Sequence, residues 1–256
     1  MKDIEVLLLE SLNYFKDTFI YHAVDYALMA GGKRLRPNII AKLGEVYQAE
    51  EEDLEVLMVA MEWIHNYSLI HDDLPDMDDD DFRRGKLTVH KKFNEATAIL
   101  AGDTLLNGAG EILFQHSLNL EGKRLEAFLK ASYFLMKSAG GHGMIQGQMV
   151  DLHPSFDQKD YLKKTNALFL AAFMIPLLLT DPEEEEVQWM EICGQTFGSL
   201  YQYKDDVEDD QLAHYNLEDK KVLEERLKEA LDQLEMKRPE IKHLRNYLQE
   251  VLHGQG

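Results

Sequence analysis

Two acidic triplets of the form Asp-Asp-x-x-Asp stand far apart in the chain and are the residues best suited to chemistry. They are Asp72, Asp73 and Asp76, and Asp205, Asp206 and Asp209. Carboxylates this close repel one another and stay ionised only when cations or basic groups meet them. Mg²⁺ is bound by one or two carboxylates together with the oxygens of a phosphorylated substrate. Two such clusters facing each other across a cavity would form a site for a diphosphate.

The all-Asp form of the triplet is informative because chance rarely produces it. With 22 Asp among 256 residues, a shuffled chain would contain roughly 0.16 strict matches, whereas a triplet that also allowed Glu would occur about 1.5 times. The alternative for either cluster is a solvated acidic surface, and spacing alone leaves that alternative open.

Charge restricts the partners of the protein. A net charge of −20 and a pI near 4.8 argue against nucleic acid, whose binding depends on Lys and Arg that neutralise phosphates. Two compact basic segments occur in this otherwise acidic chain, GGKRLRP (31–37) and FRRGK (82–86). Glycines in the first permit close approach to a ligand, and Pro37 opens a helix whose N–H groups attract anions. A solvated basic loop is the alternative to a site for a small polyanion.

Hydrophobic spacing predicts one all-helical domain. The chain has 256 residues, 45% of them hydrophobic, which is enough to bury a large core. Apolar residues recur at helical intervals of three and four, and no convincing alternating strand is present. The clearest stripes are Val6, Leu9, Leu12 and Phe15; Leu54, Leu57, Met58, Met61 and Ile64; and Leu223, Leu227, Ala230 and Leu234.

The protein is expected to be cytoplasmic with no membrane span. Its one cysteine, Cys193, excludes an internal disulfide and suits a reducing compartment. The first residues are acidic where a signal peptide needs a basic region. The longest apolar run, 167–179, contains Pro176 and is too short to span a bilayer, so it is predicted to be a buried core helix.

The first triplet is predicted at the end of a helix. His65 and Asp72 fall on one helical stripe. Pro75 should end or kink that helix, so Asp76 and Asp78 are expected in a loop that could fold back toward a metal held by Asp72. For His65, the alternative to a ligand is a core histidine with a backbone partner.

The second triplet is predicted on one face of a helix. Positions i, i+3 and i+4 share a face, so Asp205, Asp206 and Asp209 are expected to project together, with Gln202 on the same side. Pro182 suits the first turn of this helix. The acidic run 183–186 is favoured there by the helix dipole, and we expect it to be solvated.

Taken together, these segments resemble the trans-isoprenyl diphosphate synthases, the family that includes farnesyl and geranylgeranyl diphosphate synthases. The matching segments occur in the family's order over residues 25–210: GGKRLRP, SLIHDDLPDMDDDDFRRGK, AILAGDTLL, GGHGMIQGQMVDL, KTNAL and GSLYQYKDD. The resemblance implies a single domain over residues 1–256, with long antiparallel helices around a deep central cavity and a shortened segment after residue 210. It also implies a homodimer.

The resemblance implies a role for each matched residue. Mg²⁺ would bridge Asp72, Asp78 and Asp205 to an allylic diphosphate, with support from Asp73, Asp206 and Asp209. Isopentenyl diphosphate would be bound by Lys33, Arg36, His65 and Arg84, and the allylic diphosphate by Arg83, Lys164, Thr165 and Gln202. The residues expected to act directly in catalysis are Asp72, Asp73, Asp205, Lys164 and Arg83. Tyr67 resembles the aromatic residue that stops chain growth at fifteen carbons, although ordinary core packing is its alternative.

The activity that the resemblance implies is condensation of dimethylallyl or geranyl diphosphate with isopentenyl diphosphate, to give farnesyl diphosphate. The chain departs from the family after Asp209, where lysines that close over the diphosphates are missing or are replaced by Lys220 or Lys221. Asn166 also stands where a glycine is common. One alternative is therefore a diphosphate-binding regulatory subunit that turns over poorly. A class I terpene cyclase is another, but its second motif is normally of the NDxxSxxxE kind.

Overall fold

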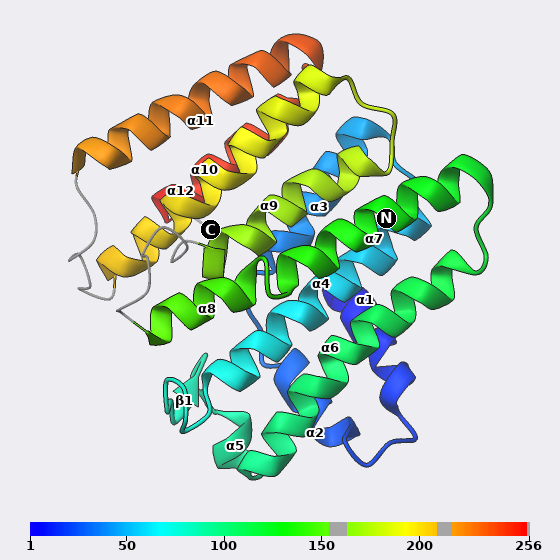
Figure 1. The fold of residues 1–256 in the computed structure, drawn as a ribbon, viewed down its shortest axis with the longest axis vertical. Coiled ribbons are helices and arrows are strands. Elements are labelled where there is room, and N and C mark those ends of the chain that lie inside the picture. Colours follow the sequence, from blue (N-terminus) through cyan, green and yellow to red (C-terminus); the bar gives the residue numbers. More distant parts are fainter. Residues whose placement is uncertain (154–162, 209–216, 255–256) are drawn as a thin grey trace. The chain divides into compact units, whose positions relative to one another are not determined.

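The structure is a computed structural model that describes residues 1–153, 163–208 and 217–254; the side chains of Asp206, Glu208 and Leu217 are excepted. The predicted metal ligand Asp209 lies outside these residues, as do residues 210–216, where the segment predicted to be shortened begins. The described chain is almost entirely helical (Figure 1), which confirms the all-α prediction. One short hairpin was not expected. Within the described residues, no helix is long and apolar enough to cross a membrane.

Contacts divide the chain into two compact units. Unit 1 comprises Met1–Asn38 and Glu51–Glu121, and unit 2 comprises Ile39–Glu50 and Gly122–Gly256. Helix α3 (Leu35–Tyr47) contributes its first turn to unit 1 and the rest to unit 2. The central cavity and the single domain over residues 1–256 stay predictions.

Unit 1 is built on two long helices, α4 (Glu51–Asp72) and α6 (Glu95–Ser117), which pack along each other. The shorter helices α1 and α2 pack against this pair. The apolar stripe predicted in α4 is buried throughout, and Trp63 on the same helix packs on Phe15 with a ring-centroid distance of 4.7 Å. The other elements are α1 (Ile4–Ser11), the 3₁₀ helix η1 (Leu12–Phe15), α2 (Tyr21–Leu28), β1 (Phe82–Arg83), β2 (Lys86–Leu87) and α5 (Val89–Lys92).

Unit 2 is built around α9 (Lys163–Leu178) and α10 (Glu184–Glu208), which pack against each other. α9 also contacts α7 and α8, and α10 contacts α11 and α12. The apolar run containing Pro176 lies almost wholly in α9 and is buried as predicted, and Cys193 is fully buried in α10. The remaining helices are α7 (Gly122–Ala139), α8 (Met144–Leu152), α11 (Leu217–Lys237) and α12 (Ile241–His253).

Two predictions about faces were wrong. In α1, Val6 and Leu9 are 46% and 59% exposed, whereas Leu8 is buried. The α-helix gives way to a 3₁₀ helix at Leu12, so spacing carried through to Phe15 does not describe a single face. At the start of α10, Glu186 is buried instead of solvated because it forms an ion pair with Arg238 (2.5 Å).

Candidate functional site

The first acidic motif forms a turn that closes on the end of α4. The helix ends at Asp72, before Pro75, and the backbone N–H of Asp78 donates to the carbonyl of Asp72 (2.8 Å). Asp76 and Asp78 therefore lie in a loop, as predicted, and this loop folds back onto the helix end. The carboxylates of Asp76 and Asp78 are exposed and that of Asp72 is half-buried. Their roles as metal ligands remain predictions.

Asp73 differs from its neighbours because it is buried and paired with a cation. Its Oδ1 accepts a hydrogen bond from Arg83 Nε (2.6 Å), and Arg83 also lies 3.4 Å from Asp80. Burial raises the pKa of Asp73, and the positive charge of Arg83 opposes that rise. The pair holds the hairpin that carries Arg83 against the end of α4.

That hairpin presents Arg84 at its tip. β1 and β2 pair antiparallel, with Arg83 opposite Lys86. The two residues of the turn, Arg84 and Gly85, have φ values of 53° and 74°. A type I′ turn requires positive φ at both central residues. A tight turn therefore determines the position of the FRRG segment. Helical spacing did not predict this turn.

Arg84 lies against the glycine loop of the first basic segment. Its Nη1 donates to the carbonyl of Gly31, and a Cβ built on Gly32 would lie 2.7 Å from the guanidinium carbon. The φ of Gly32 is +137°, a conformation that residues with a side chain rarely adopt. A side chain here would also push the guanidinium of Arg84 away. The sequence predicted close approach of a ligand to these glycines, whereas the structure shows close approach of an arginine.

His65 completes a basic set that Arg36 and Arg84 begin. Arg36 Nη1 lies 3.5 Å from His65 Nε2. Burial and the surrounding arginines, Arg36 and Arg84 first among them, hold the pKa of His65 well below its usual range. The imidazole is therefore neutral near pH 7 and can donate one hydrogen bond to a phosphate oxygen. The predicted isopentenyl diphosphate residues meet here, with Lys33 exposed at the edge of the loop.

The glycine of AILAGDTLL positions the end of α4, a function that spacing did not reveal. His71, one residue before Asp72, donates from Nε2 to the carbonyl of Ile99 (3.0 Å). A Cβ on Gly102 would overlap the His71 ring. Tyr67 packs edge-on against His71, with ring centroids 5.8 Å apart, and burial raises its pKa to about 12. Tyr67 is therefore fixed in the core of unit 1.

In unit 2, Lys164 is held by an aspartate that the sequence analysis did not assign. Its Nζ lies 2.7 Å from Asp151 Oδ2, and both side chains remain partly exposed. A Cβ on Gly147 would overlap the backbone of Lys164, so this glycine sets how closely α8 approaches the start of α9. Both polar side-chain atoms of Gln148 are buried without a hydrogen-bond partner in the described part of the chain.

The remaining allylic residues meet across α9 and α10. Thr165 donates from Oγ1 to Gln202 Oε1, and Asp205 follows one turn later on α10. Gln202 and Asp205 therefore lie three residues apart in one helix, and Thr165 of α9 contacts the first of them. Asn166, beside Thr165, packs on Gly198 and donates to Ser199 Oγ (2.8 Å).

Aromatic side chains line the neighbouring region of the same helices. Phe169 packs edge-on against Phe197 with centroids 5.2 Å apart, and Tyr201 lies 5.1 Å from Phe169. Phe169 and Phe197 are fully buried, so these rings form part of the core between α9 and α10.

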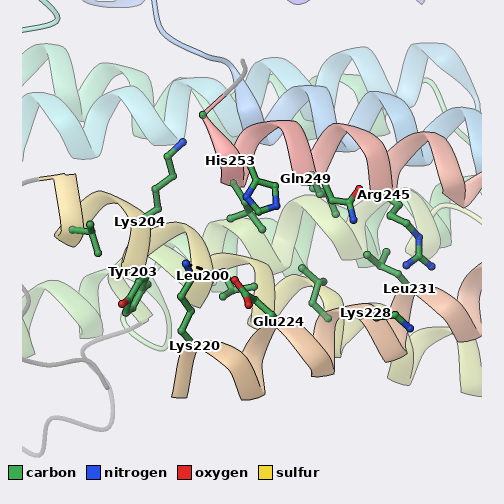
Figure 2. Close-up of a pocket in the computed structure, with 15 residues that line it drawn as sticks. Leu200, Tyr203, Lys204, Lys220, Glu224, Lys228, Leu231, Arg245, Gln249 and His253 are labelled. Carbon is green, nitrogen blue, oxygen red and sulfur yellow. Dashed lines mark ion pairs between the residues drawn. The ribbon is translucent and has the colours of Figure 1, made fainter. Parts of the chain in front are cut away.

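A separate cavity of about 510 Å³ lies behind the second acidic motif, lined by α10, α11 and α12 (Figure 2). From α10 it takes Tyr203, Lys204 and neighbouring residues, which lie on the other side of the helix from Asp205. Lys204 points toward the end of α12 and donates to the carbonyl of Val251 (2.7 Å). This cavity lies on the side of α10 that faces α11 and α12, and it is not part of the candidate site.

The carboxylates of the first motif fit a hard divalent cation. Asp72 and Asp78 are joined through their backbones and offer oxygen ligands, the kind that Mg²⁺ prefers. Among the described residues, no three His, Cys, Asp or Glu side chains are close enough to form a complete metal site. The side chains of Asp206 and Asp209 are not among those described.

Comparison with known proteins gives consistent matches. A model of the family "Polyprenyl synthetase" matches residues 17–234. The farnesyl diphosphate synthase of Micrococcus luteus is 39% identical over 197 residues, which cover 74% of this chain and 66% of that protein. The farnesyl diphosphate synthase of Buchnera aphidicola is 32% identical over 242 residues, which cover 90% of this chain and 84% of that protein.

Solved structures agree with the sequence matches. The structure of a geranyltransferase from Legionella pneumophila superposes with a TM-score of 0.84 and 31% identity, covering 98% of this chain and 93% of that one. A geranyltranstransferase from Thermotoga maritima gives a TM-score of 0.75 at 29% identity. The chain spans only 66% and 64% of the lengths of the Micrococcus luteus and Bacillus subtilis relatives.

Proposed function

Because the chain belongs to the polyprenyl synthetase family, we propose that it condenses an allylic diphosphate with isopentenyl diphosphate to form a short-chain trans-prenyl diphosphate. Dimethylallyl and geranyl diphosphate are the proposed primers and farnesyl diphosphate the proposed product. The observation that carries the proposal is that each unit combines an acidic motif with cationic and hydrogen-bonding side chains of the kind that suit a diphosphate. A solvated acidic surface does not require cationic and hydrogen-bonding side chains beside its carboxylates.

Unit 1 supplies the groups proposed to bind isopentenyl diphosphate. Arg36, Arg84 and Lys33 offer positive charge, and neutral His65 offers a hydrogen bond without adding to the repulsion among the arginines. A bidentate guanidinium matches the geometry of phosphate oxygens. These residues hold the nucleophilic double bond in place by fixing its diphosphate end.

Unit 2 supplies groups proposed to bind the allylic diphosphate. Lys164, oriented by Asp151, would stabilise negative charge as the carbon–oxygen bond to the diphosphate breaks. At an effective dielectric near 20, a pair of unit charges about 4 Å apart contributes on the order of 4 kcal/mol. The allylic cation that remains is attacked by the double bond of isopentenyl diphosphate, and the released diphosphate accepts the proton that is lost.

Mg²⁺ is the proposed cofactor, held by Asp72, Asp78 and Asp205 with support from Asp73, Asp206 and Asp209. When bound, it supplies a Lewis acid that neutralises the oxygens of the departing diphosphate. The chain's own contribution is the turn that joins Asp72 to Asp78 and the helical face that carries Asp205. In the present arrangement Asp73 supports the motif through Arg83, which is itself proposed to contact the allylic diphosphate.

A second candidate is a diphosphate-binding subunit that turns over poorly. It is favoured by the sequence after Asp209, where Lys220 and Lys221 are the nearest lysines. Lys220 lies over the ring of Tyr203 at 5.3 Å, at the cavity behind α10. The cation is therefore on the other side of α10 from Asp205, where it would not close over a diphosphate.

We also propose a cytoplasmic homodimer. Leu100 and Phe114 on α6 and Leu118, which directly follows α6, are 58%, 69% and 85% exposed. Large apolar side chains gathered on one helix face are typical of interaction surfaces. Light scattering should give the mass of two chains, and Leu118→Lys should shift it toward one.

A product assay tests the proposed activity. The protein is incubated with isopentenyl diphosphate, Mg²⁺ and either dimethylallyl or geranyl diphosphate, and the products are separated by chromatography. Formation of farnesyl diphosphate, abolished by chelation of the metal, would support the synthase. Metal-dependent binding of the primer without chain extension would favour the binding subunit, and release of a cyclic hydrocarbon would indicate a cyclase.

A further inference from the structure

The basic segment GGKRLRP places its three cations in different environments. Lys33 is exposed, Arg36 is half-buried, and Arg34 is only 5% exposed. A guanidinium enclosed by protein cannot meet a diphosphate in solution. Arg34 therefore has a role different from those of the cations on either side of it.

Arg34 is the buried centre of a group of interactions, which we call the Arg34 clasp. The clasp consists of Arg34, Glu5, Glu62 and the carbonyl of Leu28. Arg34 donates from Nε to Glu5 Oε1 (2.8 Å), from Nη1 to Glu62 Oε1 (2.6 Å) and from Nη2 to the Leu28 carbonyl (2.6 Å). Only the planar fork of arginine can reach three acceptors in these directions. The clasp thereby joins α1, the end of α2 and α4.

Glu62 connects the clasp to the helix that carries His65. It lies one turn before His65 on α4, and its side chain is 2% exposed. Asn66 donates to both its carboxylate (3.1 Å) and its backbone carbonyl (2.8 Å). Hydrogen bonds from Arg34 and Asn66 hold this buried carboxylate in one position. The position of Arg34 is thus fixed relative to His65.

The backbone of the loop requires such an attachment. Arg34 has φ of 47°, in the left-handed region that residues other than glycine seldom adopt. Conformations of this kind persist when surrounding interactions determine them. On its other side the loop rests on Arg84 through Gly31 and Gly32. A shift of the loop would therefore displace Lys33, Arg36 and Arg84 together.

We propose that Arg34 is a positioning residue, whose clasp with Glu5 and Glu62 holds Lys33, Arg36 and Arg84 against His65 in the geometry that binds isopentenyl diphosphate. The assignment rests on the proposed function of that site. Arg34 itself touches no substrate. Its replacement affects the use of isopentenyl diphosphate and leaves the allylic diphosphate largely unaffected.

The decisive variant replaces the ion pair by apolar residues of similar size, Arg34→Met with Glu62→Leu. Removal of Arg34 alone would leave Glu62 buried and unpaired and would destabilise the fold, whereas replacement of both partners is often neutral. We expect an unfolding midpoint near that of the wild type. The KM for isopentenyl diphosphate should rise about tenfold, equivalent to about 1.4 kcal/mol. The KM for geranyl diphosphate and kcat should change by less than about twofold.

A matched pair in unit 2 provides the control. Arg238→Met with Glu186→Leu removes an ion pair of similar length, with Glu186 also buried. This control should leave the KM for isopentenyl diphosphate unchanged. Arg34→Lys keeps the positive charge but loses the forked guanidinium, so its KM for isopentenyl diphosphate should lie between those of the wild type and the double variant. If the double variant does not fold, Arg34→Lys is used to test the proposal.

An unchanged KM for isopentenyl diphosphate in a folded double variant would overturn the proposal, as would an equal rise for both substrates. If the wild type condenses nothing, the proposed function is wrong, and calorimetric titration with isopentenyl diphosphate and Mg²⁺ then tests the clasp. About tenfold weaker binding by the double variant would support it. Equal affinity, or no binding by the wild type, would overturn it.

Discussion

The two acidic motifs are supported by different kinds of structure. In unit 1 the motif begins at a helix end and continues into turns, with positive φ at Asp79 and Arg84. In unit 2, Gln202 and Asp205 lie within an uninterrupted helix, and their mutual position follows from helical spacing alone. The first arrangement depends on contacts between distant segments, so it is sensitive to changes outside the motif. The second depends mainly on the integrity of α10 and its packing against α9.

The ionisable groups of the two regions differ in the same way. Asp73 and Glu62 in unit 1 are buried and paired with arginines, and His65 is kept neutral. Lys164 and Asp151 in unit 2 are roughly one third exposed. Solvent screens the second pair, and it contributes little to stability. Loss of one partner from a buried pair in unit 1 should therefore reduce stability as well as function, whereas loss of the Lys164 pair should reduce activity alone.

The largest effect is expected from the motifs themselves. Asp72→Asn and Asp205→Asn each remove a carboxylate proposed to hold Mg²⁺, and each should lower kcat by about 10³-fold, equivalent to about 4 kcal/mol. Initial rates with geranyl and isopentenyl diphosphate would measure this. The exposed Asp17→Asn variant makes the same change of charge outside the site and should retain wild-type rates. Loss in only one of the two motif variants would show that the motifs are not equivalent.

Tyr67→Ala should change the product. Tyr67 and Tyr47 are both 5% exposed, the first in unit 1 and the second in unit 2. Truncation of either should cost about 3–4 kcal/mol of unfolding free energy. Only Tyr67→Ala should give chains longer than fifteen carbons, detected by chromatography. A fifteen-carbon product from a folded Tyr67→Ala variant would leave Tyr67 as a core residue only.

Alanine substitutions at two glycines compare how well each unit tolerates an added methyl group. A methyl group on Gly147 would meet the backbone of Lys164, whereas one on Gly102 would meet the side chain of His71. Backbone cannot rotate away, so Gly147→Ala should cost about 2–3 kcal/mol and Gly102→Ala about 1 kcal/mol. Gly110→Ala, with no atom nearer than 4.0 Å, serves as the control in denaturant titrations. The reverse order would show that unit 1 is the more rigid region.

His65 should make stability depend on pH. In the unfolded chain its imidazole gains a proton near pH 6.5, but in the folded protein it does so only at lower pH. The unfolded state therefore binds more protons below about pH 6.5, and stability falls as pH decreases, by up to about 1.4 kcal/mol per pH unit. His65→Gln should remove this decrease in urea titrations at pH 7.5 and 5.5. The exposed His22→Gln variant should keep it; a wild-type slope in His65→Gln would contradict the assignment.

Regular features of the fold were predictable because they repeat at helical intervals. The buried stripe of α4, the buried helix around Pro176 and the shared face of Gln202 and Asp205 all follow from spacing. Pro75 located the end of α4, and so placed Asp76 and Asp78 in a loop. These predictions needed only local rules.

The remaining features depend on contacts that local rules cannot supply. Arg34 resembles Lys33 and Arg36 in sequence, and only its burial distinguishes it. One signal was present: Glu62 interrupts the otherwise apolar run 56–64 of α4, and a buried carboxylate needs a cationic partner. No comparable signal marked the contact between His71 and Gly102. The sequence identified these residues as part of matching segments but not what they touch.

The burial of Cys193 makes the native protein convenient for labelling. Its thiol is enclosed in α10, and burial raises its pKa, so the reactive thiolate is scarce at neutral pH. A cysteine introduced at an exposed position, such as Phe19 in unit 1 or Val222 in unit 2, would then be the preferred target for a maleimide probe. A pair of spin labels or fluorophores attached in this way would report how the distance between the units responds to substrate, without removal of the native cysteine.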